Sequence, residues 1–200
     1  MQNAIPEAIA QATLRRRGVA YAGEVRRLLD AGLQVMARCG TDSRPRVADI
    51  VEAAGLSNDA FYRHFPSKDA LVAAILDDGA ERLRGYLEHQ MAKGRSPEAR
   101  VRRWVEGVLA QADDEIAATT RAVLWNGGPT AGGRQVDRLG PLLVEPLREL
   151  GSPDPELAAS LAGHAVIGRL ADHLWQETRP TTGDVERVTA FCLAAARTGA

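Results

Sequence analysis

The chain has 200 residues, of which 45% are hydrophobic, and its 25 basic and 26 acidic side chains give a formal net charge of −1. No apolar run reaches the roughly 18 residues that span a membrane, and the N-terminal stretch lacks the order of a signal peptide, which excludes both features and predicts a cytoplasmic protein. The small net charge hides a difference between the two ends of the chain. Residues 1–66 carry nine basic and seven acidic side chains, whereas residues 67–200 carry sixteen and nineteen.

The pattern is helical almost throughout, and no alternating apolar run predicts a strand. Residues 1–20, which contain Arg15, Arg16 and Arg17, are predicted to form a flexible arm. This arm is either a solvated tail or a segment that reaches the minor groove or the phosphates of DNA. The first helix is predicted over residues 21–39. Its inward face is predicted to consist of Val25, Leu28, Leu29, Gly32 and Met36.

The segment from Val47 to Leu71 has the pattern of two short helices around a tight turn, followed by the start of a third helix. Gly55 ends the first of these, because glycine accepts the left-handed backbone conformation of a sharp turn. Ser57 is a suitable N-cap for the second. The apolar positions of the first short helix share one face and are Val47, Ile50, Val51 and Ala54. The segment therefore predicts a helix-turn-helix, and residues 21–66 a DNA-binding domain.

The helix after Ser57 has two different faces. Phe61 and Phe65 are predicted to face inward, and the other side carries the polar residues Asn58, Asp59, Tyr62 and Arg63. A two-turn helix of this kind suits insertion into the major groove. There Asp59 could accept from a cytosine amino group, but near the phosphates it would either cost affinity or pair with Arg63. Beyond Pro66, Lys68 lies in the first turn of the next helix, where a phosphate could share the helix amides and the cation. Arg44 and Arg46 add positive charge beside the preceding helix.

These residues resemble the N-terminal signature of the TetR family of bacterial transcriptional regulators over roughly residues 20–75. The matching positions are Val47, Asp49-Ile50, Ala54-Gly55, Ser57, Phe61-Tyr62, His64-Phe65, Ser67-Lys68 and Leu71. Two features depart from the family pattern. Pro45-Arg46 stands where members often carry threonine, and Asp59 puts a negative charge where neutral or basic groups are common.

The resemblance implies roles for individual residues. Tyr62 and Lys68 would contact phosphates, and His64 would either contact a phosphate or support the helix. The residues nearest the bases would be Asn58, Asp59 and Ala60. The complete set of candidate DNA-binding residues is Arg46, Ser57, Asn58, Asp59, Ala60, Tyr62, Arg63, His64 and Lys68.

The rest of the chain, residues 67–200, is predicted to be a larger helical domain for effector binding and dimerisation. The whole chain is thus predicted to be all-α, with about nine helices. A long helix over residues 68–93 links it to the DNA-binding domain. Residues 126–133 are predicted to be a flexible connection and not a phosphate loop, because they lack a terminal Lys-Ser/Thr and a preceding strand. The other helices are predicted over residues 98–112, 114–125, 136–150 with an interruption at Gly140-Pro141, 155–177 and 183–197.

The last two helices are either the outer layer of the monomer core or half of a four-helix dimer interface. The first has a narrow stripe formed by Leu161, His164, Ala165, Gly168, Asp172 and Trp175. The second has an apolar seam formed by Val185, Val188, Cys192 and Ala195. The family resemblance implies a homodimer through these helices, because such regulators read palindromic operators with paired recognition helices.

An effector site is predicted between the helices of residues 97–175, where all three tryptophans lie. Its candidate residues are Trp104, Arg121, Trp125, His164, Asp172 and Trp175. Each is alternatively a packed or hydrogen-bonded residue of the core or of an interface. No metal site is predicted, because His164 and His173 point to nearly opposite sides of one helix and the two cysteines lack ligand spacing.

Together these features predict a ligand-responsive transcriptional regulator, a repressor that a small molecule releases from a palindromic operator. The chain has none of the GxSxG, HExxH or nucleotide-loop motifs, so we expect neither enzymatic activity nor a cofactor. Two alternatives stay open. One is a helical carrier or enzyme with a vestigial DNA-binding head, and the other is a DNA-organising protein without an effector.

Overall fold

The computed structural model describes residues 4–128 and 131–196. Within these ranges the chain is helical and contains no strand, which confirms the all-α prediction. The helices of the N-terminal domain are α1 (Ala4–Cys39), α2 (Val47–Ala54) and α3 (Asn58–His64). They are followed by α4 (Lys68–Met91), α5 (Pro97–Leu109), the 3-10 helix η1 (Ala110–Ala112), α6 (Asp114–Gly127), α7 (Ala131–Leu139), η2 (Gly140–Leu143), α8 (Val144–Glu149), α9 (Pro155–Gln176) and α10 (Thr182–Ala195).

The described part of the chain has ten α-helices where the sequence predicts about nine. The difference arises at Gly140-Pro141, where the predicted interrupted helix is divided into α7, η2 and α8, because proline lacks an amide hydrogen and opposes continuous α-helix. The predicted connection over residues 126–133 is also too long. α6 continues to Gly127 and α7 begins at Ala131, whereas residues 129–130 lie outside the described residues.

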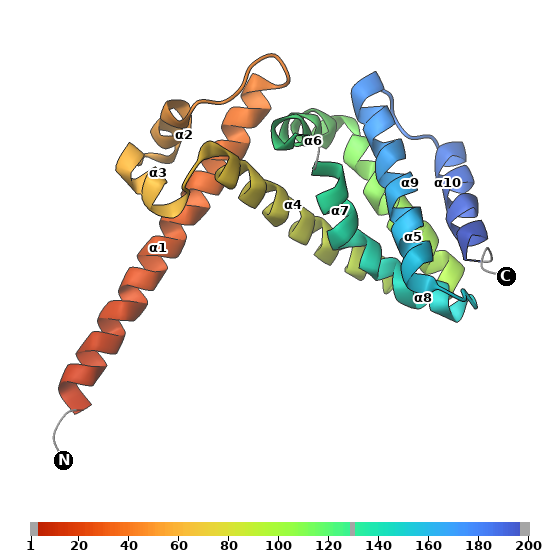
Figure 1. The fold of residues 1–200 in the computed structure, drawn as a ribbon, viewed down its shortest axis with the longest axis horizontal. Coiled ribbons are helices and arrows are strands. Elements are labelled where there is room, and N and C mark those ends of the chain that lie inside the picture. The colour runs from red at the N-terminus through yellow and green to blue at the C-terminus, as the bar shows by residue number, and fades with distance from the viewer. Residues whose placement is uncertain (1–3, 129–130, 197–200) are drawn as a thin grey trace.

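The first helix begins at Ala4, so its predicted start at residue 21 is wrong. Its N-terminal half projects away from the rest of the molecule (Figure 1). This half is rich in alanine and arginine, which favour helix, and Pro6 lies within the first turn, where proline is tolerated. Arg15 and Arg17 are exposed on it. The flexibility of residues 1–20 stays a prediction, and residues 1–3 lie outside the described residues.

A compact core holds α1, α2, α3 and the first half of α4 together. Its largest fully buried side chains are Leu28, Met36, Ile50, Phe61 and Leu71. Local caps set the helix ends as predicted. Gly55 has φ 62° after α2, and the hydroxyl oxygens of Ser57 and Ser67 accept from Ala60 N and Ala70 N, each at 3.1 Å. These caps fix the turn that presents α3.

A second core joins the C-terminal half of α4 to α5, α8, α9 and α10. Trp104 lies at its centre with no exposed surface, and its indole Nε1 donates to the Leu139 carbonyl at 3.1 Å. Cys192 is buried in the same core, and burial raises the pKa of its thiol to about 12. Figure 1 shows α10 beside α9 and α5, at the end of the molecule opposite α3.

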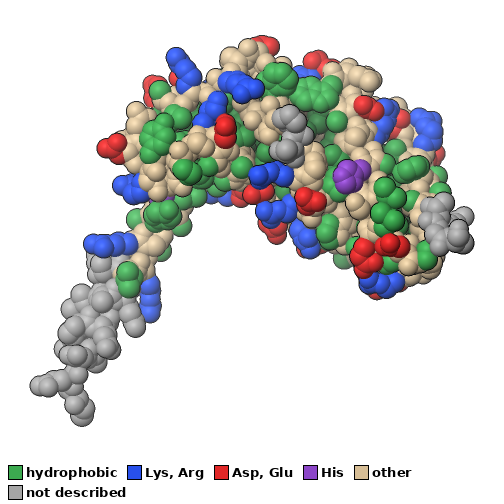
Figure 2. All heavy atoms as spheres, in the orientation of Figure 1, with side chains coloured by type: hydrophobic (Ala, Val, Ile, Leu, Met, Phe, Trp, Pro, Cys, Tyr) green, Lys and Arg blue, Asp and Glu red, His purple; other side chains and the backbone are tan. Residues whose placement is uncertain are grey.

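Basic and acidic side chains are mixed on the face of the molecule that Figure 2 draws. Figure 2 shows basic and acidic side chains next to one another over the body of the molecule, as expected for a net charge near zero. Ion pairs lie along α4, for example Arg82 with Asp78 at 2.9 Å and Arg84 with Glu88 at 3.1 Å. Among the described residues, no helix combines the length and apolar character that crossing a bilayer requires.

Candidate functional site: DNA-binding surface and ligand cavity

The outer face of α3 is polar and exposed. Asn58 and Asp59 are exposed at its start, and Tyr62 is 57% exposed one turn later. The inner face is closed, because Phe61 is fully buried and Phe65 is 8% exposed. The two-sided helix predicted from the sequence is therefore present, and its apolar side anchors α3 against α1 and α2.

The other candidate DNA-binding residues lie at the start of α2, in α3 with its N-cap, and in the first turn of α4. Arg46 is exposed at the start of α2, where its guanidinium binds both oxygens of Asp49 at 2.9 and 3.0 Å. Ser57 uses its hydroxyl to cap α3. Ala60 is only 6% exposed, so its methyl group faces the domain and not the solvent, contrary to its expected place nearest the bases. Lys68 is partly exposed and forms no ion pair with any described residue.

A carboxylate of α1 binds both basic residues at the end of α3. Glu24 Oε2 accepts from Arg63 Nη2 at 2.8 Å and from His64 Nε2 at 2.6 Å. The bond from His64 and, to a smaller extent, the bond from Arg63 hold the pKa of the Glu24 carboxyl below its usual value. The side chain of His64 is fully buried and Tyr21 packs edge-on against its ring, with ring centroids 4.2 Å apart.

This cluster decides two of the alternatives that the sequence leaves open. His64 supports the helix and does not present its ring to the solvent. Arg63 binds Glu24, so the expected pair between Asp59 and Arg63 does not form. Glu24 could not be recognised from the sequence, because 39 residues separate it from Arg63 and no local pattern connects them.

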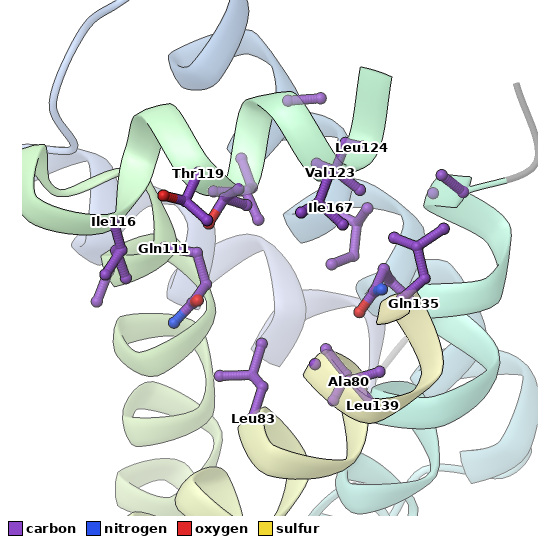
Figure 3. A pocket seen from close by; sticks show the side chains of 18 of the residues that line it. Ala80, Leu83, Gln111, Ile116, Thr119, Val123, Leu124, Gln135, Leu139 and Ile167 are labelled. Atoms are coloured by element: carbon purple, nitrogen blue, oxygen red, sulfur yellow. The ribbon is translucent and has the colours of Figure 1, made fainter. Parts of the chain in front are cut away.

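A cavity of about 1180 Å³, open to the solvent, lies between α4, α6, α7 and α9. Figure 3 shows it from close by, with Leu83 and Ala80 of α4 on one side and Val123 and Leu124 of α6 on another. Most of the lining is aliphatic. The half-buried uncharged polar residues that line it are Gln111, Thr119, Thr120 and Gln135, and the exposed Tyr86 also belongs to the lining.

Only Trp175 of the six candidate ligand residues lines this cavity. Trp104 belongs to the core, and Trp125 packs edge-on against Trp175 with ring centroids 6.1 Å apart. Arg121 joins the middle of α6 to the C-terminal end of α9 by donating to the Leu174 carbonyl at 3.1 Å.

The remaining two candidates are on the outer surface of α9. His164 Nδ1 bonds to the carbonyl oxygen of Ser160 at 2.8 Å, and Asp172 lies 3.5 Å from Arg169. The tryptophans thus indicated the region of the chain that forms much of the cavity, but most of the candidate residues do not line it. The actual polar residues come from helices far apart in the chain, and nothing in their local sequence marks them.

The predicted α9 stripe and the predicted α10 seam differ in exposure. The predicted seam of α10 packs on the monomer core, where Cys192 has no exposed surface and Val185 and Val188 are partly buried. The predicted stripe of α9 faces outward instead. Leu161 is 54% exposed and Trp175 is 49% exposed, and Phe191 of α10 is 54% exposed. The monomer leaves these large apolar side chains uncovered.

Comparison with known proteins identifies the N-terminal domain. The family described as "Bacterial regulatory proteins, tetR family" matches residues 28–75, the segment from the end of α1 through the helix-turn-helix to α4. This N-terminal part of the chain is thus similar to the TetR family of regulatory proteins. An uncharacterized HTH-type transcriptional regulator, YvdT of Bacillus subtilis (strain 168), is 36% identical over 56 residues, which are 28% of this chain and 28% of YvdT. This likeness to YvdT thus spans about a quarter of each protein.

Solved structures of TetR-type fold extend the likeness to the C-terminal helices. RolR in complex with resorcinol superposes with a TM-score of 0.66 at 21% identity, covering 88% of this chain and 89% of RolR. The fatty acid degradation regulator FadR from Bacillus halodurans gives 0.62 at 19% identity, covering 85% of this chain and 94% of FadR. At these identities the likeness shows the fold alone. Over this part of its length the chain has the fold of solved TetR-family regulators.

Proposed function

We propose that this chain is a ligand-responsive repressor that binds a palindromic operator as a homodimer and leaves it when a small molecule fills the cavity. The observation that carries the proposal is the outer face of α3, which exposes Asn58, Asp59 and Tyr62 while Phe61 is buried beneath them. Exposed hydrogen-bonding groups on a two-turn helix suit the edges of bases in the major groove.

Phosphate contacts are assigned to Tyr62 and Lys68. Lys68 is in the first turn of α4 and has no acidic partner among the described residues, so its charge and the free amides of that turn are available to one anion. Arg46 is exposed nearby but shares its charge with Asp49. Arg63 would have to leave Glu24 before it could reach a phosphate or a base.

The homodimer is assigned to the exposed surface of α9 and α10. Leu161 and Trp175 of α9 and Phe191 of α10 are each about half exposed, although each is large and apolar. Two copies packed through these helices would form a four-helix interface. Such a dimer must place its two α3 helices about one turn of DNA apart, roughly 34–36 Å, to enter successive major grooves.

The cavity adjoins the DNA-binding domain directly. Ile75 and Leu76 of α4 line the cavity and also belong to the core of the N-terminal domain, and Leu33 of α1 reaches the same wall. A molecule in the cavity would therefore touch the helix that carries Lys68. RolR, a protein of the same fold, has been solved with the small molecule resorcinol, which supports a ligand role for this half of the fold.

The test compares the chain's two lysines. A high-affinity duplex is first selected from random DNA, and its binding is then measured by fluorescence anisotropy at several salt concentrations. Lys68→Ala should weaken binding and lower the slope of log affinity against log salt by about 0.9, the value for one phosphate contact. Lys93→Ala, an exposed position at the far end of α4, should leave both unchanged.

Equal behaviour of the two variants would remove Lys68 from the interface. A folded dimer that binds no duplex at low salt would overturn the repressor proposal. If that protein still bound small molecules, the carrier alternative would take its place.

A further inference from the structure

The cavity separates its charged groups from its uncharged polar groups. Of the charged residues that line it, Asp113 and Arg179 are exposed, and Arg82 is 51% exposed and pairs with Asp78 at 2.9 Å. The polar residues at half-buried positions are all uncharged, and they are Gln111, Thr119, Thr120 and Gln135. Charge is thus confined to the part of the lining that water reaches.

Two glutamine side chains enter the cavity from different walls. Gln111 belongs to η1 and Gln135 to α7, and Figure 3 shows their amides on opposite sides of the open space. Gln111 has one long contact, 3.5 Å to the Gly107 carbonyl oxygen. The Gln135 side chain forms no hydrogen bond with any described residue. Each amide therefore keeps donors and its acceptor available to a ligand.

The surface between the two amides is aliphatic. Leu83 of α4, Leu139 of α7 and Ile167 of α9 line it (Figure 3). An ionised group placed there would lose its hydration and meet no opposite charge. An uncharged apolar skeleton would lose no such hydration, and polar groups at its ends could form hydrogen bonds with the glutamines. The cavity, at about 1180 Å³, is large enough for a drug-sized molecule.

We infer that the cavity selects uncharged molecules with an apolar skeleton and a hydroxyl or carbonyl group at each end, bound between Gln111 and Gln135. The inference rests on the proposed function, since it names the class of effector for the same cavity. The binding preference can nevertheless be measured without DNA.

The experiment uses probes that share a skeleton and differ in charge. One pair is a biphenyl with a hydroxyl group on each ring and the same biphenyl with a carboxylate on each ring. The other pair is sebacate and the saturated diol of the same chain length. Binding of each probe to the full-length protein is measured by isothermal titration calorimetry. At least one diol should bind, and its dicarboxylate should bind about tenfold more weakly or not at all.

Variants then test the two glutamines. Gln111→Leu with Gln135→Leu keeps similar volume and should weaken binding of the diol about tenfold, because the ligand's hydroxyl groups lose their partners. Gln90→Leu, at the end of α4 and away from the cavity, should leave binding unchanged. The two single variants are measured as well, and circular dichroism confirms that each protein is folded.

The inference is overturned if a dicarboxylate binds as tightly as its diol, if neither diol binds, or if the glutamine variants bind the diol like the wild type. Failure of the proposed function looks different. In that case the diol binds as expected, but the selected duplex remains bound to the protein at saturating diol. Conversely, a dicarboxylate that releases DNA would preserve the repressor and exclude this effector class.

Discussion

The crossing of α4 and α5 depends on a missing side chain. Gly107 of α5 is buried, and a Cβ atom at this position would lie 2.5 Å from Leu87 Cδ2 and 3.3 Å from Tyr86 Cε1. Leu87 has no exposed surface and is enclosed by the C-terminal core, so it cannot turn into the solvent. Gly107→Ala must therefore separate the two helices or distort their side chains.

The neighbouring Gly85 provides a matched control, because it is also helical but exposed, with nothing within 4 Å of its added Cβ. At Gly85, alanine should stabilise the protein by about 0.5–1 kcal/mol through reduced backbone entropy of the unfolded chain. At Gly107 the same gain is opposed by an overpacking cost of about 1–3 kcal/mol. We expect Gly107→Ala to be less stable than Gly85→Ala by about 1–3 kcal/mol.

Urea unfolding followed by circular dichroism measures this difference directly, and by the usual scaling the melting temperatures of the two variants should differ by roughly 2–12 °C. The wild type should lie below Gly85→Ala and level with or above Gly107→Ala. A Gly107→Ala protein as stable as Gly85→Ala would refute the argument, since it would mean that α4 and α5 have room for a methyl group where the structure has none.

Three further changes test other parts of the structure. Trp104→Phe leaves the buried Leu139 carbonyl without its donor and should lower the free energy of unfolding by at least about 1–3 kcal/mol in urea titrations; an unchanged midpoint would contradict this. The pKa of the buried Asp184 carboxyl is held well below its usual value, chiefly by the hydrogen bond from the Thr181 hydroxyl. The carboxylate therefore contributes to the stability of the fold above about pH 4, and this contribution declines as the pH falls through the folded-state pKa. Asp184→Asn should flatten the loss of stability in unfolding curves below that pH, and identical curves would exclude the role. Glu24→Gln should raise affinity for non-specific duplex in low-salt anisotropy, because Arg63 loses an acidic partner; equal or weaker binding would argue against it.

The helix-turn-helix could be predicted from sequence because its determinants are local. Ser57 caps α3 through an amide three residues away, Ser67 does the same for α4, and Gly55 turns the chain with its own positive φ. Each signal lies within one helical turn of its effect. The predicted start of α1 is wrong because composition alone does not distinguish a tail from a helix. Three arginines resemble a solvated tail in composition, yet arginine is also a good helix former.

The ligand cavity could not be predicted in the same way, because it depends on how distant helices pack. Gln111 of η1 and Gln135 of α7 are separated in sequence by the whole of α6 and line one cavity only when these helices pack together, and neither lies in a distinctive motif. Residue size favoured Trp104, which instead fills the core. Glu24 and Arg63 meet for the same long-range reason. The exposed polar face of α3 could thus be predicted from the sequence, whereas the contacts between helices could not.

The proposed coupling between cavity and DNA has a specific steric basis at Leu76. Its side chain is 4% exposed, belongs to the core of the N-terminal domain and also lines the cavity. On its other side, Gly127 of α6 is so close that an added Cβ would lie 2.4 Å from Leu76 Cδ1. A ligand that displaces Leu76 must therefore move α4 or α6, since close-packed interiors leave no slack. Movement of α4 would carry Lys68 with it, and the ligand can shift this equilibrium only by the difference between its affinities for the two arrangements.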